Sequence, residues 1–577
     1  MKVVIVGGVA GGATAAARLR RLDEHAEIIM IERTGYVSYA NCGLPYYIGG
    51  SITDKQKLTL QTPESFKNRF NVDARVNQEV IAINREEMTV DIRDLVTGNV
   101  YTESYDKLIL SPGARAVIPR VPGVDLAGVY SLRTVEDTFE IHRFIEEQQP
   151  KSAVVVGAGF IGLEMAENLV ERGLKVSILQ RPDHVMNTVD ADMASFLHEN
   201  LRRHGIDLYL EADMTGITDT EDGLAVSFGK KGENTDAPKR TIKADMVVLA
   251  IGVTPETHLA EEAGLELGLK HTIVVDEHMR TSDPHIFAVG DAVQVKHMAT
   301  GYPAVISLAG PANKQGRVAA DTICGLDHEF AGSMGSSILK LFDMTVASTG
   351  LNSKAAEAAG LAFDYVVITS PSHATYYPGA KPMTVKVLYD TDTFEIIGGQ
   401  IVGCEGVDKR IDVLAMAIFA GLDCYDLADL DLAYAPPFSS AKDPVNVAGY
   451  VIQNICDGIL DQVHWSDVER DFLNPETKDD NVVLLDTRRA PEFEMKHVEG
   501  ALNIPVDALR DRISELPQNK RIYVYCKTGL RSYVACRMLA QHGFDVRNVS
   551  GGFAFYSAIT ADHMMRETGV GPCGETN

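Results

Sequence analysis

Two short apolar runs, at residues 3–6 and 153–156, are each followed by glycines and then by a segment with the apolar spacing of a helix. A strand of this length that is apolar throughout is typical of a parallel sheet with both faces covered. A strand, a glycine turn and a helix in this order form the repeating unit of doubly wound α/β folds. The repetition therefore predicts two nucleotide-binding folds of the Rossmann type in the first part of the chain.

The pattern changes after these two folds. Alternation of apolar and polar residues at 383–388 predicts a strand with one buried face, and residues 411–420 have helical spacing. This region is expected to be an α+β domain without a nucleotide motif. Residues 456–480 are polar, contain the only tryptophan, Trp465, and are expected to form a linker. A further α/β pattern, at residues 482–564, predicts a C-terminal domain.

The chain has 577 residues, of which 45% are hydrophobic and 23% charged, as in globular proteins of about three or four domains. Its formal net charge of −26 argues against a nucleic-acid-binding surface, because phosphate binding requires a basic face. The eight cysteines lack the paired spacing of a disulfide framework, and no apolar stretch is long enough to span a membrane. Because Arg18, Arg20 and Arg21 follow the first apolar run, it does not resemble a signal peptide. We therefore expect a cytoplasmic protein with reduced thiols.

The second glycine turn has the spacing of a dinucleotide-binding fingerprint. Gly157, Gly159 and Gly162 form G-x-G-x-x-G between an apolar run and a helix. Gly157 permits the tight turn, Gly159 lets the backbone approach a pyrophosphate, and Gly162 lets helix and strand pack closely. The N-terminus of the helix offers N–H groups and the positive end of its dipole to the phosphates. We expect a dinucleotide to bind here.

The first glycine turn departs from this fingerprint. Gly7, Gly8 and Gly12 are present, but Val9 stands at the position of the middle glycine, so a purely structural turn is an alternative. Glu32 ends the next apolar run, where a carboxylate can bind the ribose hydroxyls of a nucleotide. Glu32 therefore favours a second nucleotide site.

Two cysteines lie in segments that indicate thiol chemistry. Cys42 follows the first glycine turn and has no partner cysteine four residues away, since the next cysteine is Cys324. Its redox partner is therefore expected to be an external thiol compound or an oxidised state of Cys42 itself. Cys526 opens a loop behind the apolar residues 522–525. Converging N–H groups, Arg531 and the following helix would lower the pKa of this thiol and let it carry sulfur.

Three parts of the sequence resemble known families. Residues 38–46, S-Y-A-N-C-G-L-P-Y, are similar to the coenzyme A-disulfide reductases, in which the single cysteine forms a mixed disulfide with coenzyme A. Residues 281–291, which end in Asp291, resemble the second flavin motif of the pyridine nucleotide-disulfide oxidoreductases. Residues 482–501 and the loop 526–531 resemble a rhodanese domain with sulfurtransferase spacing. The chain thus resembles fusions of coenzyme A-disulfide reductase and rhodanese, some of which reduce persulfides or polysulfides with NADH.

The resemblance implies an α/β protein with two Rossmann-like nucleotide-binding domains, an α+β dimerisation domain and a C-terminal rhodanese-like α/β domain. FAD would bind at the first glycine turn, and NADH or NADPH would bind at the second. The implied boundaries are 1–149 and 276–325 for the FAD-binding domain, 150–275 for the NAD(P)H-binding domain, 326–455 for the dimerisation domain, 456–480 for the linker and 481–577 for the rhodanese-like domain.

The resemblance also implies binding residues. Those expected to hold FAD and the nicotinamide nucleotide lie in and around the two glycine turns: Gly7, Gly8, Gly12, Glu32, Arg33, Asn41, Ala114, Gly157, Gly159, Ile161, Gly162, Gln180, Gly252, Gly290 and Asp291. Those expected to bind coenzyme A are Thr14, Arg18, Arg21, Ser38 and Asn41. Thr14, Arg18 and Arg21 have helical spacing, so their side chains could bind phosphates, although a solvated basic stripe is the alternative.

The implied catalytic residues are Cys42, Cys526, Arg531, Tyr376 and Tyr434, with Tyr377 as an alternative to Tyr376. In relatives such tyrosines reach across a dimer interface toward the cysteine of the other subunit, so a homodimer is expected. A phenol there could donate a proton to a leaving thiolate. No metal is expected.

The sequence leaves several alternatives open. Gln180 and Arg181 stand where an NAD-preferring site usually has an acid, and Arg181 could attract a 2′-phosphate or point into solvent, so NADH and NADPH both remain. Coenzyme A disulfide, coenzyme A persulfide and polysulfide are not distinguished. A sulfur-carrier protein is a second hypothesis. An NADH oxidase or peroxidase is a third, but Ala10 stands where those enzymes place a histidine.

Overall fold

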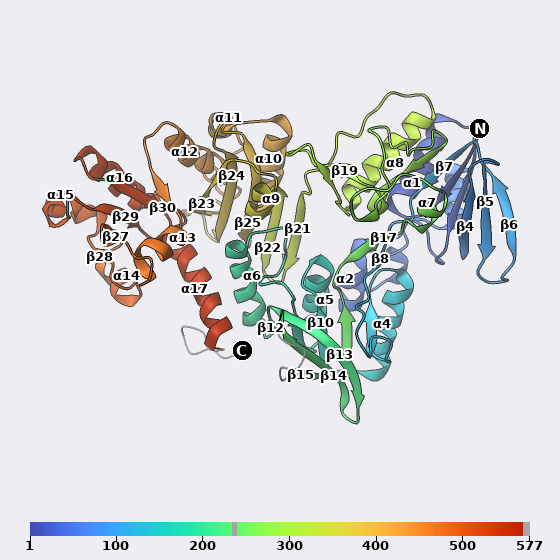
Figure 1. Ribbon diagram of the computed structural model, residues 1–577, viewed down its shortest axis with the longest axis horizontal. Coiled ribbons are helices and arrows are strands. Elements are labelled where there is room, and N and C mark those ends of the chain that lie inside the picture. Colours follow the sequence, from blue (N-terminus) through green and yellow to red (C-terminus); the bar gives the residue numbers. More distant parts are fainter. Residues whose placement is uncertain (233–238, 569–577) are drawn as a thin grey trace. The chain divides into compact units, whose positions relative to one another are not determined.

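The computed structural model describes residues 1–232 and 239–568 (Figure 1). They form two compact units. One consists of Met1–Asp183 and Gly205–Gly335, and the other of His184–His204 and the described part of Ser336–Asn577. Within the described residues, no helix is both long enough and apolar enough to cross a membrane.

The first unit contains a parallel sheet with the strand order β18-β7-β1-β2-β3. Its central strand is fully buried at Val3, Val4 and Ile5, as expected from the apolar run. Helix α1 packs against α8 so closely that a Cβ on Gly316 would lie 2.3 Å from the carbonyl oxygen of Gly11. The elements are β1 (Lys2–Val6), α1 (Ala10–Leu22), β2 (Glu27–Glu32), α3 (Pro63–Phe70), β3 (Asp73–Val76), β7 (Lys107–Leu110), β18 (Ile286–Ala288) and α8 (Ala309–Ile323).

The same unit contains a second parallel sheet, with the order β12-β11-β10-β16-β9. Val154 and Val155 of its central strand are fully buried, and α5 follows that strand directly after the second glycine turn. The elements are β9 (Val129–Ser131), α4 (Val135–Gln148), β10 (Ser152–Val156), α5 (Phe160–Glu171), β11 (Lys175–Leu179), β12 (Asp207–Tyr209) and β16 (Met246–Leu249). The two sheets confirm the prediction of two Rossmann-like folds.

Smaller sheets and helices complete the first unit. The antiparallel ones are β4 (Gln78–Asn84), β5 (Thr89–Asp94) and β6 (Val100–Ser104); β13 (Ala212–Thr220), β14 (Gly223–Lys230) and β15 (Arg240–Ala244); β8 (Ala114–Ala116) with β17 (Val253–Pro255); and β19 (Val295–Lys296) with β20 (Pro303–Ala304). The short helices are α2 (Leu44–Gly49) and α7 (His258–Glu262). Strand β8 lies between β7 and β9 in the chain and pairs with β17, so this ribbon joins segments of both Rossmann-like folds.

The second unit contains the predicted α+β domain, with an antiparallel sheet in the order β21-β22-β25-β24-β23. Helices α10, α11 and α12 share an apolar core with this sheet. The predicted strand at residues 383–388 lies in β24, and the predicted helix at 411–420 lies in α10. The elements are β21 (Ser337–Leu341), β22 (Met344–Gly350), α9 (Ser353–Ala358), β23 (Phe363–Pro371), β24 (Pro382–Asp390), β25 (Ile396–Gly403), α10 (Val407–Ala420), α11 (Cys424–Asp429) and α12 (Pro444–Cys456).

Helix α6 (Ala191–Arg203) belongs to the second unit, although its position in the chain falls within the expected NAD(P)H-binding domain, 150–275. One contact that holds it there is electrostatic. The buried ammonium group of Lys386, on β24, lies 2.8 Å from a carboxylate oxygen of Asp190 and 2.7 Å from one of Asp192. A buried charge requires such partners, so these ion pairs fix the start of α6 to the antiparallel sheet.

The C-terminal part of the second unit is a parallel sheet with the order β26-β30-β29-β27-β28. Its elements are β26 (Gln462–Val463), α13 (Trp465–Val468), β27 (Val482–Asp486), α14 (Ala490–Met495), β28 (Leu502–Asn503), α15 (Leu509–Arg512), β29 (Arg521–Tyr525), α16 (Leu530–Gln541), β30 (Val546–Val549) and α17 (Gly552–Thr568). The last residues of the predicted rhodanese-like domain, 569–577, lie outside the described residues.

The expectation of a linker at 456–480 is corrected by this sheet. Strand β26 pairs with β30 in parallel, at Gln462 with Asn548 and at Val463 with Val549. Trp465 is buried, and its indole N–H donates a hydrogen bond to the Gly552 carbonyl oxygen over 3.0 Å. The polar composition misled the prediction because the segment's few apolar residues are the ones that enter the core.

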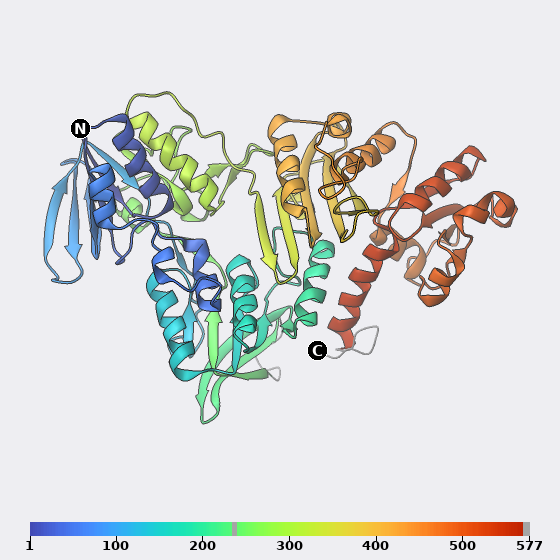
Figure 2. The same cartoon turned by 180° about the vertical axis from the view of Figure 1, so that it is seen from behind.

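The C-terminal helix α17 packs against α6, and Figure 2 shows the red helix beside the teal one. Asp562 is buried between them, with its carboxylate 2.8 Å from Nδ1 of His198 and 2.8 Å from Nη1 of Arg202. Arg566 pairs with the same carboxylate. The Val185 N–H donates to His198 Nε2 over 3.1 Å, so Nδ1 carries the proton and donates to Asp562. The C-terminal domain is thus docked through a buried charge cluster.

Candidate active sites

The first glycine turn is closed by backbone contacts that exclude side chains. A Cβ on Gly7, whose φ is +95°, would lie 2.0 Å from the Ser111 carbonyl oxygen, and one on Gly12 would lie 2.0 Å from that of Gly7. The Gly8 N–H donates to Glu32 Oε2 over 2.8 Å, which places the buried carboxylate beside the turn. The turn, the start of α1 and a carboxylate at the end of β2 therefore form a cradle that fits a dinucleotide.

Residues far apart in the chain meet around Arg133, next to this cradle. Its guanidinium contacts Asp291 Oδ2 over 2.9 Å and donates from Nε to the Ala114 carbonyl oxygen over 2.8 Å. The Asn41 amide lies against the same arginine, with oxygen accepting from Nη1 over 2.9 Å and nitrogen donating to the Arg133 carbonyl over 3.1 Å. The Gly290 N–H donates to Gln315 Oε1 over 2.7 Å. Three residues expected to contact FAD are thus grouped by an arginine that sequence analysis did not single out.

The second glycine turn has the same construction. A Cβ on Gly157, with φ at +99°, would lie 2.3 Å from the Ala250 carbonyl oxygen, and one on Gly162 would lie 2.0 Å from that of Gly157. Space around Gly159 is open, with no atom within 4 Å of an added Cβ. Gln180 Oε1 accepts a hydrogen bond from the Ala158 N–H over 2.9 Å, so this side chain supports the turn.

The other residues expected to bind nucleotides are less enclosed. Arg181 is 67% exposed and lies 3.6 Å from a carboxylate oxygen of Asp213. Arg33 is half exposed and lies 3.6 Å from Glu256. Gly252 has φ at +120° immediately before β17, and Ile161 is half-buried in the first turn of α5. Arg181 is therefore free to turn toward a phosphate at the end of β11, at the cost of a weak surface ion pair.

Cys42 lies in a 3₁₀ turn, Asn41–Gly43, that leads into α2. The segment before it is tied to the first glycine turn, because the Ser38 N–H donates to the Gly8 carbonyl oxygen over 2.7 Å. Helix α2 packs against α5 of the second Rossmann-like fold, where a Cβ on Gly49 would overlap the Asn168 side chain. The exposed thiol is thus held between the two glycine turns.

Burial and the neighbouring charges of Glu164 and Arg133 influence the pKa of the Cys42 thiol. Partial burial raises its pKa, the Glu164 carboxylate raises it further, and Arg133 lowers it. Burial also raises the pKa of Glu164, on α5, to about 7, while Tyr46 donates a hydrogen bond to its Oε1 over 3.4 Å. Glu164 was not among the expected site residues, although it lies only two positions after Gly162, the last glycine of the second turn.

Replacement of Glu164 by glutamine is expected to lower the pKa of Cys42, because a neutral amide does not oppose formation of the thiolate. The rate of Cys42 alkylation by iodoacetamide, measured against pH in a Cys526→Ser background, should shift to lower pH. Glu171→Gln, at the exposed end of the same helix, is the control and should leave the profile unchanged. An unchanged profile in Glu164→Gln would show that this carboxylate does not affect Cys42.

The residues expected to bind coenzyme A divide into two groups. Ser38, with φ at +46°, and Asn41 flank Cys42. Thr14 and Arg18 lie along α1, where the Thr14 hydroxyl donates to Asn313 over 2.6 Å and Arg18 Nε donates to the buried Asp321 over 2.6 Å. Arg21 is exposed at the end of the same helix. Arg18 is already paired within the protein, so a role in phosphate binding would require it to share its guanidinium.

Tyr376 and Tyr434 lie together, with their hydroxyl oxygens 2.5 Å apart, and both are exposed. Their hydrogen bond raises the pKa of Tyr376. The buried Arg410 holds the two loops in place by contacting Asp443 over 3.0 Å and the Ser372 carbonyl oxygen over 3.0 Å. The structure therefore brings together the two tyrosines that sequence analysis paired, and Arg410 is the residue that it missed.

The Cys526 loop forms a compact cradle for sulfur. The buried Sγ accepts a hydrogen bond from the Gly529 N–H over 3.1 Å and lies 3.6 Å from the Ser532 hydroxyl. Gly529 has φ at +110° and immediately precedes α16, so the N-terminus of that helix points toward the sulfur. N–H donors and a helix N-terminus stabilise a thiolate or persulfide anion.

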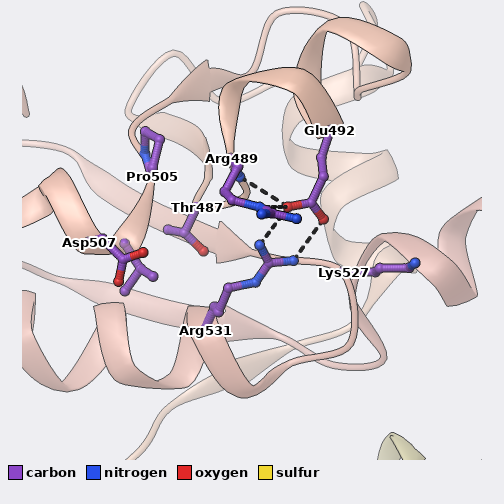
Figure 3. Close-up of a pocket in the computed structure, with 8 residues that line it drawn as sticks. Thr487, Arg489, Glu492, Pro505, Asp507, Lys527 and Arg531 are labelled. Carbon is purple, nitrogen blue, oxygen red and sulfur yellow. Dashed lines mark hydrogen bonds and ion pairs between the residues drawn. The ribbon is translucent and has the colours of Figure 1, made fainter.

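A pocket of about 380 Å³ opens beside this loop (Figure 3). It is lined by Thr487, Arg489, Glu492, Pro505, Val506, Asp507, Lys527 and Arg531. Glu492 receives two hydrogen bonds from Arg531, over 2.7 and 2.9 Å, which lower the pKa of the carboxyl group to about 2. Figure 3 shows the side chains of Glu492 and Arg531 in direct contact among the residues that line the pocket. Glu492 therefore fixes the position of Arg531, a role that sequence analysis did not assign.

The family described as pyridine nucleotide-disulphide oxidoreductase matches residues 1–316. The chain belongs to the pyridine nucleotide-disulphide oxidoreductase family. The dimerisation domain of that family matches residues 336–444, and a rhodanese-like domain matches residues 470–558. The rhodanese-like match begins within the segment first expected to be a linker, in agreement with the burial of Trp465.

Several members of the pyridine nucleotide-disulphide oxidoreductase family are similar over most of their length. Coenzyme A disulfide reductase of Staphylococcus aureus is 38% identical over 450 residues, which cover 78% of this chain and 99% of that protein. The structure of reduced Bacillus anthracis CoADR-RHD has 47% identity and a TM-score of 0.92, covering 97% of this chain and 98% of that one. The NAD-dependent persulfide reductase from A. fulgidus has 37% identity and a TM-score of 0.88, covering 96% and 100%. The predicted resemblance is thereby confirmed.

Proposed function

We propose that this protein is an FAD-dependent reductase that uses NADH or NADPH to reduce coenzyme A persulfide, polysulfide or coenzyme A disulfide at Cys42, with a sulfurtransferase site at Cys526. The observation that carries the proposal is the placement of Cys42, held by Ser38 against one glycine turn and by α2 against the helix of the other. The full-length similarity to a persulfide reductase and to CoADR-RHD supports the substrate class.

FAD fits the first cradle, where Gly7, Gly8 and Gly12 allow the tight turn that presents the start of α1 to a pyrophosphate and Glu32 can accept from ribose hydroxyls. Asp291 and Gly290 would hold the rest of the cofactor beside Cys42. Gly157, Gly159 and Gly162 would hold the nicotinamide nucleotide. Bound FAD would relay two electrons from the nicotinamide nucleotide to a disulfide at Cys42.

In the proposed reaction the Cys42 thiolate attacks a sulfur atom of the substrate disulfide or persulfide. A mixed disulfide forms at Cys42, and the leaving thiolate or hydrosulfide takes up a proton. Two electrons then break the mixed disulfide, which returns the Cys42 thiolate and releases the remaining thiol. Glu164, whose pKa is about 7, can hold a proton near Cys42 at neutral pH, and Tyr46 is hydrogen-bonded to it.

The proposal includes a homodimer in which Tyr376 and Tyr434 act beside the Cys42 of the other subunit. The dimerisation domain of the family is present at residues 336–444. In this region Tyr376 and Phe438 are 74% and 71% exposed, so large apolar side chains are available to a second copy. The contact between the hydroxyl groups of Tyr376 and Tyr434 would let one phenol donate a proton to a leaving thiolate while the other stabilises it.

We propose that NADH is used and that NADPH is tolerated. No carboxylate follows β11 to repel a 2′-phosphate, because Gln180 and Arg181 occupy that place. Arg181 is 67% exposed and its ion pair with Asp213 is a surface contact, so it can turn toward the phosphate of NADPH.

The direct test is NADH oxidation by the purified protein with coenzyme A persulfide, polysulfide, coenzyme A disulfide or oxygen alone. Sulfide release or thiol formation, in step with NADH oxidation and without another protein, would support the proposed enzyme. Dependence on an added acceptor protein would favour the sulfur-carrier alternative. Rapid NADH consumption with oxygen alone would favour an oxidase. The oxidase alternative is tested because the water-forming NADH oxidase from Lactobacillus brevis has 29% identity and a TM-score of 0.75, covering 80% of this chain and 99% of that one.

Replacement of Cys526 by serine is expected to abolish transfer of sulfane sulfur from thiosulfate to cyanide, because no thiol remains to form the persulfide. Reduction of coenzyme A disulfide should stay within about two-fold of wild type, since ordinary substitutions away from a site have small effects. The two activities are measured on the same full-length preparation. Cys404→Ser, at an exposed cysteine, is the control, and full sulfurtransferase activity in Cys526→Ser would contradict the assignment.

A further inference from the structure

Cys424 and Cys456 are in contact at the apolar core shared by the antiparallel sheet and helices α10, α11 and α12, and the proposed function uses neither. Their Sγ atoms lie 3.9 Å apart, with the Cys424 thiol directed toward Cys456. Cys424 is the first residue of α11, and Cys456 is the last residue of α12. Among the cysteines in residues 1–232 and 239–568, this is the pair whose sulfur atoms are in hydrogen-bonding contact.

Two further contacts keep these helix ends together. Tyr425, next to Cys424, donates from its hydroxyl to Asp457 Oδ1 over 2.8 Å, and Asp457 is next to Cys456. The helices also approach closely along their length, because a Cβ on Gly449 would lie 2.6 Å from the Ala428 backbone nitrogen. The two sulfur atoms are therefore held as neighbours by the fold on both sides.

Disulfide formation requires only a short approach. A disulfide has an S–S length of about 2.05 Å, so the sulfur atoms must close by about 1.9 Å from their present separation. Both cysteines are at helix termini, where a side chain can change its rotamer without passing through a helix interior. The arrangement is thus close to that of a bonded pair.

We propose that Cys424 and Cys456 form a dithiol site that is oxidised to an intramolecular disulfide by organic disulfides. The inference rests on the proposed function only for the identity of the oxidant, because coenzyme A disulfide is a compound that this enzyme would meet. The site is a place of modification, distinct from Cys42 and Cys526.

The reaction proceeds by two thiol–disulfide exchanges. Cys456 is half-buried whereas Cys424 is fully buried, so Cys456 meets the external disulfide first. Its thiolate attacks one sulfur of that disulfide, forms a mixed disulfide and releases one thiolate, which takes up a proton. The Cys424 thiolate then attacks Sγ of Cys456 and releases the second thiol. Overall, two protein thiols are oxidised to one disulfide, and one external disulfide is reduced to two thiols.

The site lies where the chain passes from the dimerisation domain into the rhodanese-like domain. Six residues after Cys456, the Gln462 side chain donates to Asp364 Oδ2 over 2.8 Å, and His464 Nε2 lies 2.7 Å from Oδ1 of the same carboxylate. Tyr389, which is buried near the two thiols, donates to Asp364 over 3.3 Å. A disulfide would therefore fix the end of α12 beside this junction.

The test uses full-length protein that carries Cys42→Ser and Cys526→Ser, so that neither proposed catalytic thiol takes part. The protein is incubated with coenzyme A disulfide or with oxidised glutathione, denatured in N-ethylmaleimide and digested for mass spectrometry. We expect a peptide pair joined through Cys424 and Cys456, with loss of alkylation at both, reversed by dithiothreitol. Addition of Cys456→Ser or Cys424→Ser should remove the joined pair, and addition of Cys324→Ser should leave it.

Recovery of both cysteines in alkylated form, or of Cys456 as a stable mixed disulfide without the joined pair, would overturn the proposal. Because Cys424 is buried, tryptophan fluorescence of Trp465 checks that each variant is folded, and Cys456→Ser provides an independent variant if Cys424→Ser is not. Failure of the proposed function would appear separately, as the absence of NADH oxidation by the wild-type protein with coenzyme A disulfide. Such a failure would not change the expected oxidation of Cys424 and Cys456 by glutathione disulfide.

Discussion

Cys42→Ser is expected to lower NADH-dependent reduction of coenzyme A disulfide and coenzyme A persulfide by about 10³-fold or more. Serine cannot form the mixed disulfide. The next cysteine in the sequence is Cys324, so no neighbouring cysteine can replace Cys42. The backbone anchor from Ser38 to Gly8 does not involve the thiol, so the site should keep its shape. Steady-state NADH oxidation, with sulfide or thiol measured in parallel, provides the readout.

The matched control for this variant is Cys324→Ser. Cys324 is a half-buried cysteine that follows the last residue of α8, in the same unit. Its replacement should leave the reductase rate within about two-fold of wild type. Full activity in Cys42→Ser would refute the thiol mechanism, whereas equal losses in the two variants would indicate damage to the fold.

Asp562→Asn is expected to destabilise the second unit by about 3 kcal/mol. The change leaves Arg202, Arg566 and His198 without the buried carboxylate that they share. Urea unfolding followed by the fluorescence of Trp465 suits this test, because the single tryptophan stacks on Tyr556 of α17 with ring centroids 4.3 Å apart. The unfolding midpoint should move to lower urea concentration.

Asp343→Asn provides the control. Asp343 pairs with Arg203 of α6, the helix that also carries Arg202, but both side chains of this pair are more than half exposed. An exposed pair of this kind contributes about 1 kcal/mol or less. An equal effect of the two substitutions would show that burial does not strengthen the Asp562 cluster.

The Asp562 cluster also predicts how stability depends on pH. Burial raises the pKa of Asp562, but hydrogen bonds and charges from His198 and the arginines outweigh burial and lower the folded-state pKa. The contribution of Asp562 to the free energy of unfolding is therefore fully present above its unfolded pKa of about 3.9. This contribution is lost as the pH falls toward the folded-state pKa. Burial lowers the pKa of His198, so the unfolded chain gains a proton below about pH 6.5 that the folded chain does not. The free energy of unfolding should therefore begin to fall below about pH 6.5, and the deficit of Asp562→Asn should shrink only near pH 4.

The elements that sequence analysis predicted well are those with strong local patterns. The runs at residues 3–6 and 153–156 are apolar without interruption and became the central strands of their sheets. The segment at 456–480 failed because β26 has only two residues and Trp465 packs against residues almost ninety positions later. Helix α6 joined the second unit through Lys386, a partner that local spacing does not reveal.

The same division holds for the site residues. Glu164 could have been found, because it lies two positions after Gly162 of the glycine motif, and it accepts a hydrogen bond from Tyr46 of α2, the helix that follows Cys42. Arg133 could not, since its partner Asp291 is 158 positions away and no local motif surrounds it. Glu492 pairs with Arg531 across 39 positions for the same reason. Side chains that orient a catalytic group are often recruited from distant segments, and only the fold brings them together.

The docking of α17 on α6 limits the movement of the rhodanese-like domain, and with it the movement of Cys526 during sulfur transfer. The rhodanese-like domain is attached through the chain that follows α12, through the contacts of Gln462 and His464 with Asp364 on β23, and through the contact of α17 with α6. An arm attached at one end samples space according to the statistics of a flexible polymer, and its local concentration depends on the length of the tether. A domain held at both ends has no such tether. Glycine insertions after Asp457 would therefore change the strain on the docked rhodanese-like domain, and they would not extend the distance over which Cys526 can move.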